Sequence, residues 1–208
     1  MTEEQSKQAA QHPVSAGNPC PFLRALVADG TLVDGVEPIN NIANTIVEVA
    51  KKGEGAPDVK PGAIRVIAMI ASGLSPWAVL QSKRKGVQLN ALRSGPLNKK
   101  GVGSGILDAS GKVDPKELAR LKEFASQKNS SGGTTELGLS LAELTTFMDA
   151  NFKRAAGKRR RIDRALMNGE WPVLLRVMGK KGTGGRYLSV ADVEELVVQR
   201  RLPERMRS

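Results

Sequence analysis

The sequence contains a single cysteine, and this cysteine stands between two prolines directly ahead of a helical pattern. Pro19 and Pro21 each fix a backbone φ angle, so the chain has little conformational freedom on either side of Cys20. Pro21 also suits the first position of a helix, because its missing N–H would have no partner there. The motif predicts a stiff turn that presents one sulfur atom at the start of a helix.

An apolar helix face follows the cysteine. Leu23, Leu26 and Val27 recur at the spacing of one helix face, and Gly30 is expected to end the helix. Unpaired N–H groups and the positive end of the helix dipole stabilise a thiolate at a helix N-terminus, lowering its pKa from roughly 8.5. Such a sulfur is a suitable ligand for iron. The ordinary alternative for a lone cysteine is a small buried apolar side chain.

Length and cysteine content indicate one intracellular domain. A chain of 208 residues is long enough for one core, and one cysteine excludes an internal disulfide. Residues 1–17 are polar and carry no basic-then-apolar leader, so a cytoplasmic location is expected. No apolar stretch is long enough to span a membrane. We expect residues 1–16 to form a flexible polar arm and residues 17–208 a single domain.

The chain is strongly basic, with 32 Lys and Arg against 21 Asp and Glu, a net charge of +11. The densest run is residues 158–161. Such a charge raises the possibility of nucleic-acid binding, but aromatic residues are only 3% of the chain, which argues against a base-stacking surface. A solvated basic face, or a surface for an acidic redox partner, are the other interpretations of the run.

Capping signals and helical periodicity indicate an all-α fold, because no alternating strand pattern is sustained. A glycine-rich stretch at 94–105 is expected to be a surface loop. The expected helices lie at 21–29, from Asn40 and Asn41 to Lys52, at 64–71, after Ser75-Pro76, after Asp114-Pro115, from the capping box Ser140/Glu143, over the apolar residues 173–178, and after Ser189.

Pro19-Cys20-Pro21, followed by Leu23, Leu26, Gly30, Leu32 and Gly35, resembles the N-terminal signature of the haem-thiolate haloperoxidase and peroxygenase family, the chloroperoxidase-like proteins. The resemblance extends in order over roughly residues 17–205. This chain departs from the family pattern at Arg24, where the family usually has Asn, and at Asp29, where it has His. The resemblance implies an all-α haem-binding domain.

The resemblance also implies the cofactor and the reaction. Cys20 would ligate haem b as a thiolate, with Pro19, Pro21 and Leu23 forming the surrounding loop. A thiolate trans to bound peroxide pushes electron density onto iron and favours O–O cleavage. The expected substrates are hydrogen peroxide and a small organic molecule, with halogenation, oxygenation and simple peroxidation all left open.

A second family-like segment contains Glu170. An apolar helix follows Glu170, as it follows the Gly-Glu of the family, whose Glu is the distal acid–base residue. Arg164, six residues earlier, is the expected partner of this carboxylate, with Arg161 as an alternative. We place Glu170 at the start of a helix beside Trp171, where partial desolvation would raise its pKa. The alternative is a surface carboxylate in a first helical turn.

A third segment, residues 106–110, resembles the family's divalent-cation site near a haem propionate. Ile106 stands where the family has a metal-binding carboxylate, and Leu107 stands where some members have a distal histidine. Loss of an anionic oxygen ligand weakens a Mg²⁺ or Mn²⁺ site. We therefore expect this site to be degraded, with Asp108 and Ser110 as its remaining residues.

Three functions follow in order. The first is a peroxide-using haem-thiolate enzyme with Cys20 as ligand and Glu170 as acid–base residue. The second is a non-enzymatic haem-thiolate sensor or carrier, which Ile106 and Leu107 make credible. The third, a basic helical nucleic-acid-binding protein without haem, rests on charge alone.

Overall fold

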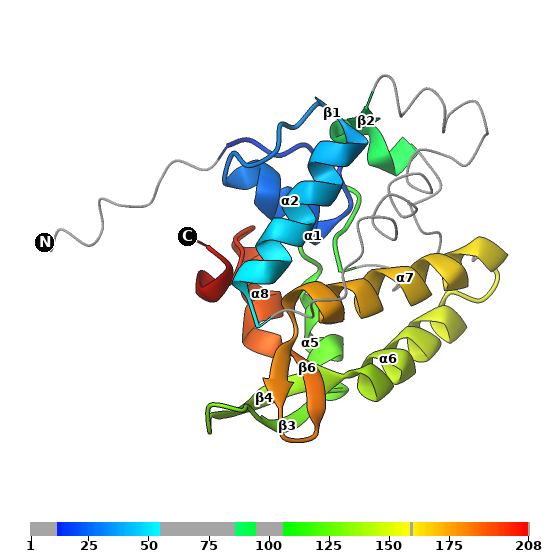
Figure 1. The fold of residues 1–208 in the computed structure, drawn as a ribbon. Helices are drawn as coiled ribbons and strands as arrows, with labels where there is room; N and C mark the ends of the chain where they lie inside the picture. The colour runs from blue at the N-terminus through cyan, green and yellow to red at the C-terminus, as the bar shows by residue number, and fades with distance from the viewer. Residues whose placement is uncertain (1–11, 55–85, 95–105, 159, 208) are drawn as a thin grey trace, which may run out of the picture.

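The structure is a computed structural model that describes residues 12–54, 86–94, 106–158 and 160–207, without the side chains of residues 94, 161–162 and 165–169 (Figure 1). The helices expected at 64–71 and after Ser75 lie outside the described residues. So does the expected glycine-rich loop beyond residue 94.

The described residues form six α-helices, six strands and two 3₁₀ helices. In chain order they are α1 (Pro21–Ala28), β1 (Val36–Glu37), α2 (Ile39–Lys52), β2 (Val87–Gln88), the 3₁₀ helix η2 (Leu89–Ser94), α5 (Pro115–Glu123), β3 (Ser126–Asn129), β4 (Thr135–Ser140), α6 (Leu141–Arg154), α7 (Arg161–Met178), β5 (Lys180–Gly182), β6 (Gly185–Ser189), α8 (Val190–Val198) and the 3₁₀ helix η3 (Glu204–Met206).

The expected all-α fold is wrong, because the protein is a mixed α/β structure with two antiparallel sheets. One sheet pairs β1 with β2, and the other has the order β3-β4-β6-β5. The sequence pattern did not predict these strands because they are two to six residues long and largely polar. β3 reads Ser-Gln-Lys-Asn and β5 reads Lys-Lys-Gly, so neither shows an apolar alternation.

Most of the expected helix boundaries are confirmed. α1 begins with Pro21 and ends ahead of Gly30, and the Asp114 side chain caps α5 by accepting from the Lys116 N–H. Ser140 and Glu143 form the expected capping box at α6. α2 differs, since it begins at Ile39 behind Pro38 and not after an asparagine cap.

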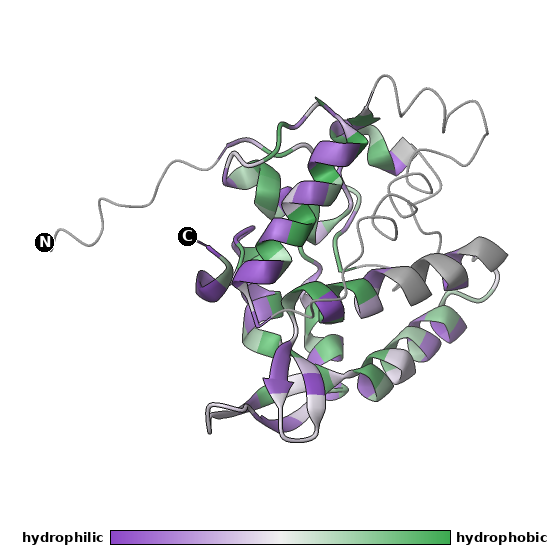
Figure 2. Ribbon diagram, in the orientation of Figure 1, coloured by the Kyte–Doolittle hydropathy of each residue, from purple (hydrophilic) through white to green (hydrophobic). Residues whose placement is uncertain are grey.

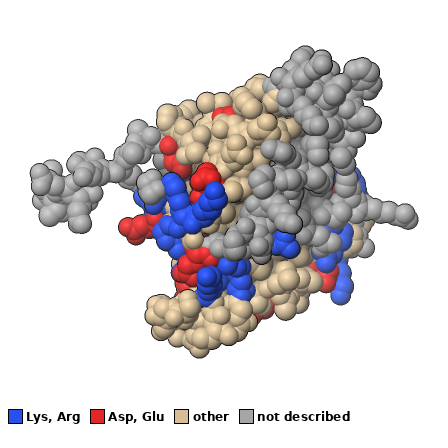
Figure 3. All heavy atoms as spheres, viewed as in Figure 1, with Lys and Arg blue, Asp and Glu red and all other residues tan. Residues whose placement is uncertain are grey.

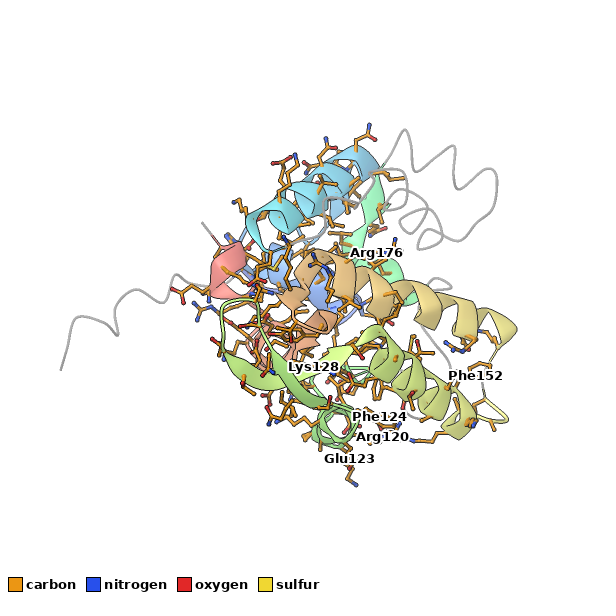
Figure 4. All side chains as sticks on the ribbon, turned by 60° about the horizontal axis from the view of Figure 1, so that its bottom comes forward. Arg120, Glu123, Phe124, Lys128, Phe152 and Arg176 are labelled. Carbon is orange, nitrogen blue, oxygen red and sulfur yellow. The ribbon has the colours of Figure 1, made fainter. Side chains whose placement is uncertain are left out.

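An aromatic stack joins α5, α6 and α7 in the core. The Phe147 ring on α6 meets the rings of Phe124 and Trp171 edge to face, with centroids 5.5 and 5.6 Å away. The Arg120 guanidinium lies 5.5 Å from the Phe124 centroid and 5.7 Å from the Phe147 centroid. Figure 4 shows Arg120 on α5 close to Phe124, the residue that follows this helix, and Phe152 towards the far end of α6. In Figure 2, the hydrophobic sides of the helices, coloured green, face the interior of the protein.

Glu136 on β4 anchors the centre of the larger sheet. Its carboxylate accepts hydrogen bonds from Lys180 Nζ at 2.7 Å, Tyr187 OH at 2.8 Å and Ser189 Oγ at 2.7 Å. Burial alone would raise the pKa of Glu136, but these bonds outweigh burial and lower it. Ser189 precedes α8, as expected, yet its hydroxyl serves Glu136 and does not cap the helix.

Residues 12–16 belong to the folded part of the chain, although we expected them in a flexible arm. The His12 N–H donates to the Ala28 carbonyl at 2.9 Å, and the Ser15 N–H donates to Asp34 Oδ2 at 2.7 Å. The rest of the expected arm, residues 1–11, lies outside the described residues. None of the helices in the described part of the chain has the length and apolar character needed to cross a membrane.

Replacing Glu143 by Ala should lower the free energy of unfolding at neutral pH by about 1–2 kcal/mol, because the capping box is lost. Burial alone would raise the pKa of Glu143, but hydrogen bonds from Lys128, Ser126 and Ser140 lower it to about 2. The carboxylate therefore stabilises the fold fully above its ordinary pKa of 4.5, and this stabilisation is lost as the pH falls towards 2.

Urea unfolding of wild type and Glu143→Ala between pH 7 and pH 2.5 checks this expectation. The stability difference should shrink below about pH 4.5. Glu123→Ala, which removes an exposed carboxylate from α5, is the matched control and should stay near wild type. A difference that is constant with pH would contradict the assignment.

Candidate functional site

Cys20 occupies the predicted position at the start of α1. It is the last residue before the helix, with an extended backbone (φ −86°, ψ 112°), and Pro21 is the first helical residue. The Cys20 side chain makes no hydrogen bond to the helix N-terminus, and it is half-buried against the apolar core. The Asn18 Oδ1 atom accepts the Cys20 N–H at 3.1 Å, which fixes the turn that leads into the helix.

Arg24 lies one helical turn beyond Cys20, with its N–H donating to the Cys20 carbonyl at 3.0 Å. A separation of four residues places the two side chains on the same helix face. Arg24 is only 4% exposed. Its Nη1 atom donates to the Ser15 carbonyl at 2.7 Å and to the Asn18 carbonyl at 3.1 Å. The arginine therefore reaches back from the helix to the segment that precedes the cysteine.

Further cations lie around Arg24. Burial is the main reason why the pKa of Arg24 is lowered, and the charges of Arg200 and Arg93 lower it further. Asp34 and Cys20 act in the opposite direction. A negative charge on the Cys20 sulfur is thus favourable for the buried guanidinium, as cations near a cysteine favour its thiolate form.

Arg93 on η2 holds the same segment from the other side. Its Nε donates to the Ala16 carbonyl at 2.6 Å, its backbone N–H donates to the Gly17 carbonyl at 2.9 Å, and its Nη2 donates to the Asp108 carbonyl. All four consecutive carbonyls of residues 15–18 therefore accept from Arg24 or Arg93. We call these two residues the arginine clamp and residues 15–18 the pre-cysteine segment.

Two glycines permit the close approach of the chains at the clamp. A Cβ atom at Gly17 would lie 1.7 Å from the Asn90 carbonyl oxygen, so no larger residue fits against η2. Gly111 has a φ of +76°, and a Cβ there would lie 2.9 Å from Arg24 Nη1 and 3.2 Å from Ala16 Cα. The turn at 108–112 is thereby packed directly onto the clamp.

Asp108 and Ser110, the expected remnants of a cation site, lie in this exposed turn. Asp108 Oδ1 accepts from the Ser110 N–H at 2.8 Å, the Ser110 hydroxyl at 2.7 Å and the Lys112 N–H at 3.0 Å. The Ser110 hydroxyl bond is the main cause of the lowered pKa of Asp108. Ile106 is buried in the core, and Leu107 pairs with Val113. The Asp108 oxygen therefore serves to fold the turn.

Glu170 and Arg164 lie on α7, but not as expected. Glu170 is the tenth residue of the 18-residue helix, so it stands mid-helix and outside the field of the helix N-terminus. It is half-buried beside the buried Trp171. Six helical residues separate Arg164 from Glu170 by about 9 Å along the axis. Arg164 Nη2 pairs with Asp149 Oδ1 of α6 at 2.5 Å.

The structure brings together some of the predicted site residues. Arg93 joins Asp108 to the pre-cysteine segment, and Cys20 and Leu23 both pack against the apolar core. Among the described contacts, α1 packs chiefly on α8, whereas α7 packs chiefly on α6, α2 and β6.

Sequence reasoning missed the roles of Arg24 and Arg93. One feature of the sequence could have predicted a role for Arg24, since this charged residue interrupts the apolar pattern of α1 one helical turn after the cysteine. Arg93 had none, because its partners lie 77 and 15 residues away in the sequence. Only the folded chain places it against the pre-cysteine segment.

The residues at Cys20 fit an anionic iron ligand. The sulfur is half-buried and lies near buried cationic charge. Two buried donors of the turn, Asn18 Nδ2 and Arg24 Nε, have no hydrogen-bond partner among the described residues. Buried polar atoms usually have partners, so these two donors are left unsatisfied by the described residues of the chain. No three His, Cys, Asp or Glu side chains of the described residues cluster as an all-protein metal site.

Comparisons of the chain with protein-family models, with curated proteins and with solved structures give no match. The function of the site is therefore argued from the residues of this chain.

Replacing Gly111 by Ala should destabilise the protein more than replacing Gly133 by Ala. Both glycines have positive φ angles, of +76° and +82°, so both substitutions carry a similar backbone cost of about 1–2 kcal/mol. Only at Gly111 would the new methyl group press on Arg24, because nothing lies within 4 Å of a Cβ at Gly133. Thermal unfolding of the two variants measures the difference. Equal melting temperatures would show that the turn does not rest on the clamp.

Proposed function

We propose that this protein is a haem-thiolate peroxidase or peroxygenase in which Cys20 is the axial ligand. The observation that carries the proposal is the placement of Cys20. Its side chain stands half-buried at the N-terminus of α1, in a turn fixed by Asn18, Pro21 and the arginine clamp. The resemblance of Pro19-Cys20-Pro21 to the haem-thiolate signature supports the same assignment.

The residues around the sulfur supply what a thiolate ligand needs. The helix N-terminus and the buried charge of Arg24 favour a negative sulfur. Leu23, like Cys20, packs against the apolar core. When bound, haem would supply the iron that activates hydrogen peroxide, and its thiolate ligand would favour cleavage of the O–O bond.

Glu170 is the proposed acid–base residue. A half-buried carboxylate beside a buried Trp171 can hold a proton and return it, which is the task of a general acid–base group in peroxide cleavage. Because Arg164 pairs with Asp149, its proposed role is to hold α7 against α6 and thereby fix the position of Glu170.

The charge distribution supports an enzyme over a nucleic-acid-binding protein. Many of the described cations pair with carboxylates, including Arg160 with Asp163 in the run 158–161 and Arg154 with Glu117 just before it. Figure 3 shows Lys and Arg atoms interleaved with Asp and Glu atoms on the face that carries the C-terminal end and the larger sheet. The phosphate backbone of a nucleic acid is bound best by Lys and Arg side chains that are not already paired with carboxylates.

Cys20→Ala should abolish the thiolate-type spectrum of the haemin-loaded protein. The measurement is the absorption band of the ferrous carbonyl complex, which is red-shifted when a thiolate is the opposite ligand. Cys20→Ser, which preserves the size of the side chain, should also lose this band. An unchanged band in either variant would contradict ligation by Cys20, and a wild type that binds no haemin would overturn the proposed function.

Glu170→Gln should leave haem binding and the carbonyl spectrum intact while slowing peroxide-dependent oxidation of an aromatic donor by about 10²–10⁴-fold. Stopped-flow mixing with hydrogen peroxide measures the rate. The control is Glu123→Gln, which changes an exposed carboxylate on α5 and should react like wild type. Equal rates in both variants would remove Glu170 from the mechanism. A wild type that binds haem but consumes no peroxide would favour the sensor or carrier function.

A further inference from the structure

We propose that Arg24 and Arg93 are positioning residues that hold the sulfur of Cys20 in one place and join it mechanically to the turn at 108–112. The consequence for iron ligation rests on the proposed function, whereas the clamp itself is a property of the chain without haem. Neither arginine is proposed to touch a substrate.

The arginine clamp holds every carbonyl of the pre-cysteine segment. The pre-cysteine segment has no helix or strand of its own, yet its four carbonyls all accept hydrogen bonds from Arg24 or Arg93. A backbone without regular structure is ordinarily held by water or by scattered side chains. Here two arginine side chains from different elements, α1 and η2, hold the carbonyls of Ser15, Ala16 and Asn18, and the backbone N–H of Arg93 holds that of Gly17.

The clamp needs arginine at position 24 and not another polar residue. Arg24 is 4% exposed, and a buried charge is tolerated only where hydrogen bonds compensate for the lost water. The planar guanidinium carries donors that point in fixed directions, so it reaches two carbonyls of a turn at once. The amide of Gln is shorter and uncharged, and it cannot span the Ser15 and Asn18 carbonyls in the same way. The clamp therefore depends on the guanidinium itself.

Both arginines of the clamp also contact the turn at 108–112. Arg93 donates to the Asp108 carbonyl while holding the Ala16 carbonyl, so one side chain touches both segments. On the other side of the clamp, the open face of Gly111 lies against Arg24. A displacement of the turn is thus transmitted to the residues just before Cys20. This assigns to Asp108 and Ser110, whose bonds shape the turn, a supporting role that needs no bound cation.

The clamp is tested first in the haem-free full-length protein, by the rate at which Cys20 reacts with a small maleimide under native conditions. Rates are compared per thiolate, from the pH profile of labelling, because loss of a nearby cation lowers the thiolate fraction. Arg24→Gln and Arg93→Gln should each raise this rate about tenfold, because the side-chain hydrogen bonds no longer restrain the turn. Arg186→Gln is the matched control. Arg186 also holds two carbonyls, those of Gly179 and Glu54, but they lie in other segments, so this variant should react like wild type.

Arg93 is partly exposed, so Arg93→Gln is expected to fold. This variant tests the clamp even if Arg24→Gln, which changes a buried residue, does not fold. Circular dichroism establishes that each labelled variant is folded. Labelling at the wild-type rate in folded Arg93→Gln would overturn the clamp. An equal rise in Arg186→Gln would overturn it too, since the effect would then be general loosening.

A second readout separates the clamp from the proposed function. In haemin-loaded protein, both clamp variants should convert part of the ferrous carbonyl complex from the thiolate-type band to the band of a neutral thiol, and Arg186→Gln should not. Faster labelling in the clamp variants, together with a wild type that binds no haem, would uphold the clamp and reject the proposed function. A thiolate-type band that is unaltered in variants with faster labelling would reject the role of the clamp in ligation.

Discussion

The organisation of the candidate site depends on one buried cation. Arg24 is nearly removed from water, and the cost of burying its charge is offset by carbonyl oxygens of the segment that precedes Cys20. This interaction fixes the turn, while Pro21 and the first turn of α1 fix the chain on its other side. The sulfur of Cys20 is therefore restrained from both directions, as a metal ligand must be if it is to hold one distance from its ion.

The rest of the fold supports this arrangement from a distance. The larger sheet is centred on Glu136, whose three hydrogen bonds join β4, β5 and β6, and α8 leaves this sheet to pack against α1. The edge-to-face stack around Phe147 fixes α5, α6 and α7 together, and with them the position of Glu170. The two halves of the proposed mechanism are thus carried by different parts of the core, the thiol by α1 and the carboxylate by α7.

Local signals were enough to predict the helices but not the sheets or the clamp. The start of α1 at Pro21 and the capping box of Ser140 follow from interactions within four residues, and both are confirmed. The strands were missed because their pairing partners lie elsewhere in the chain and their own residues are polar. Glu170 was expected at a helix start because the apolar residues that predicted the helix begin only at Val173, whereas α7 begins at Arg161 and runs through Glu170 and Pro172. The contacts of Arg93 arise only on folding, so no local pattern announces them.

The most direct test of the account is X-ray absorption at the iron edge of the full-length protein loaded with haemin. The account predicts a single sulfur neighbour of the iron in wild type, in addition to the four porphyrin nitrogens. Its loss in Cys20→Ser would assign that neighbour to this cysteine. An iron surrounded by nitrogen and oxygen alone in the wild-type protein would contradict the central claim.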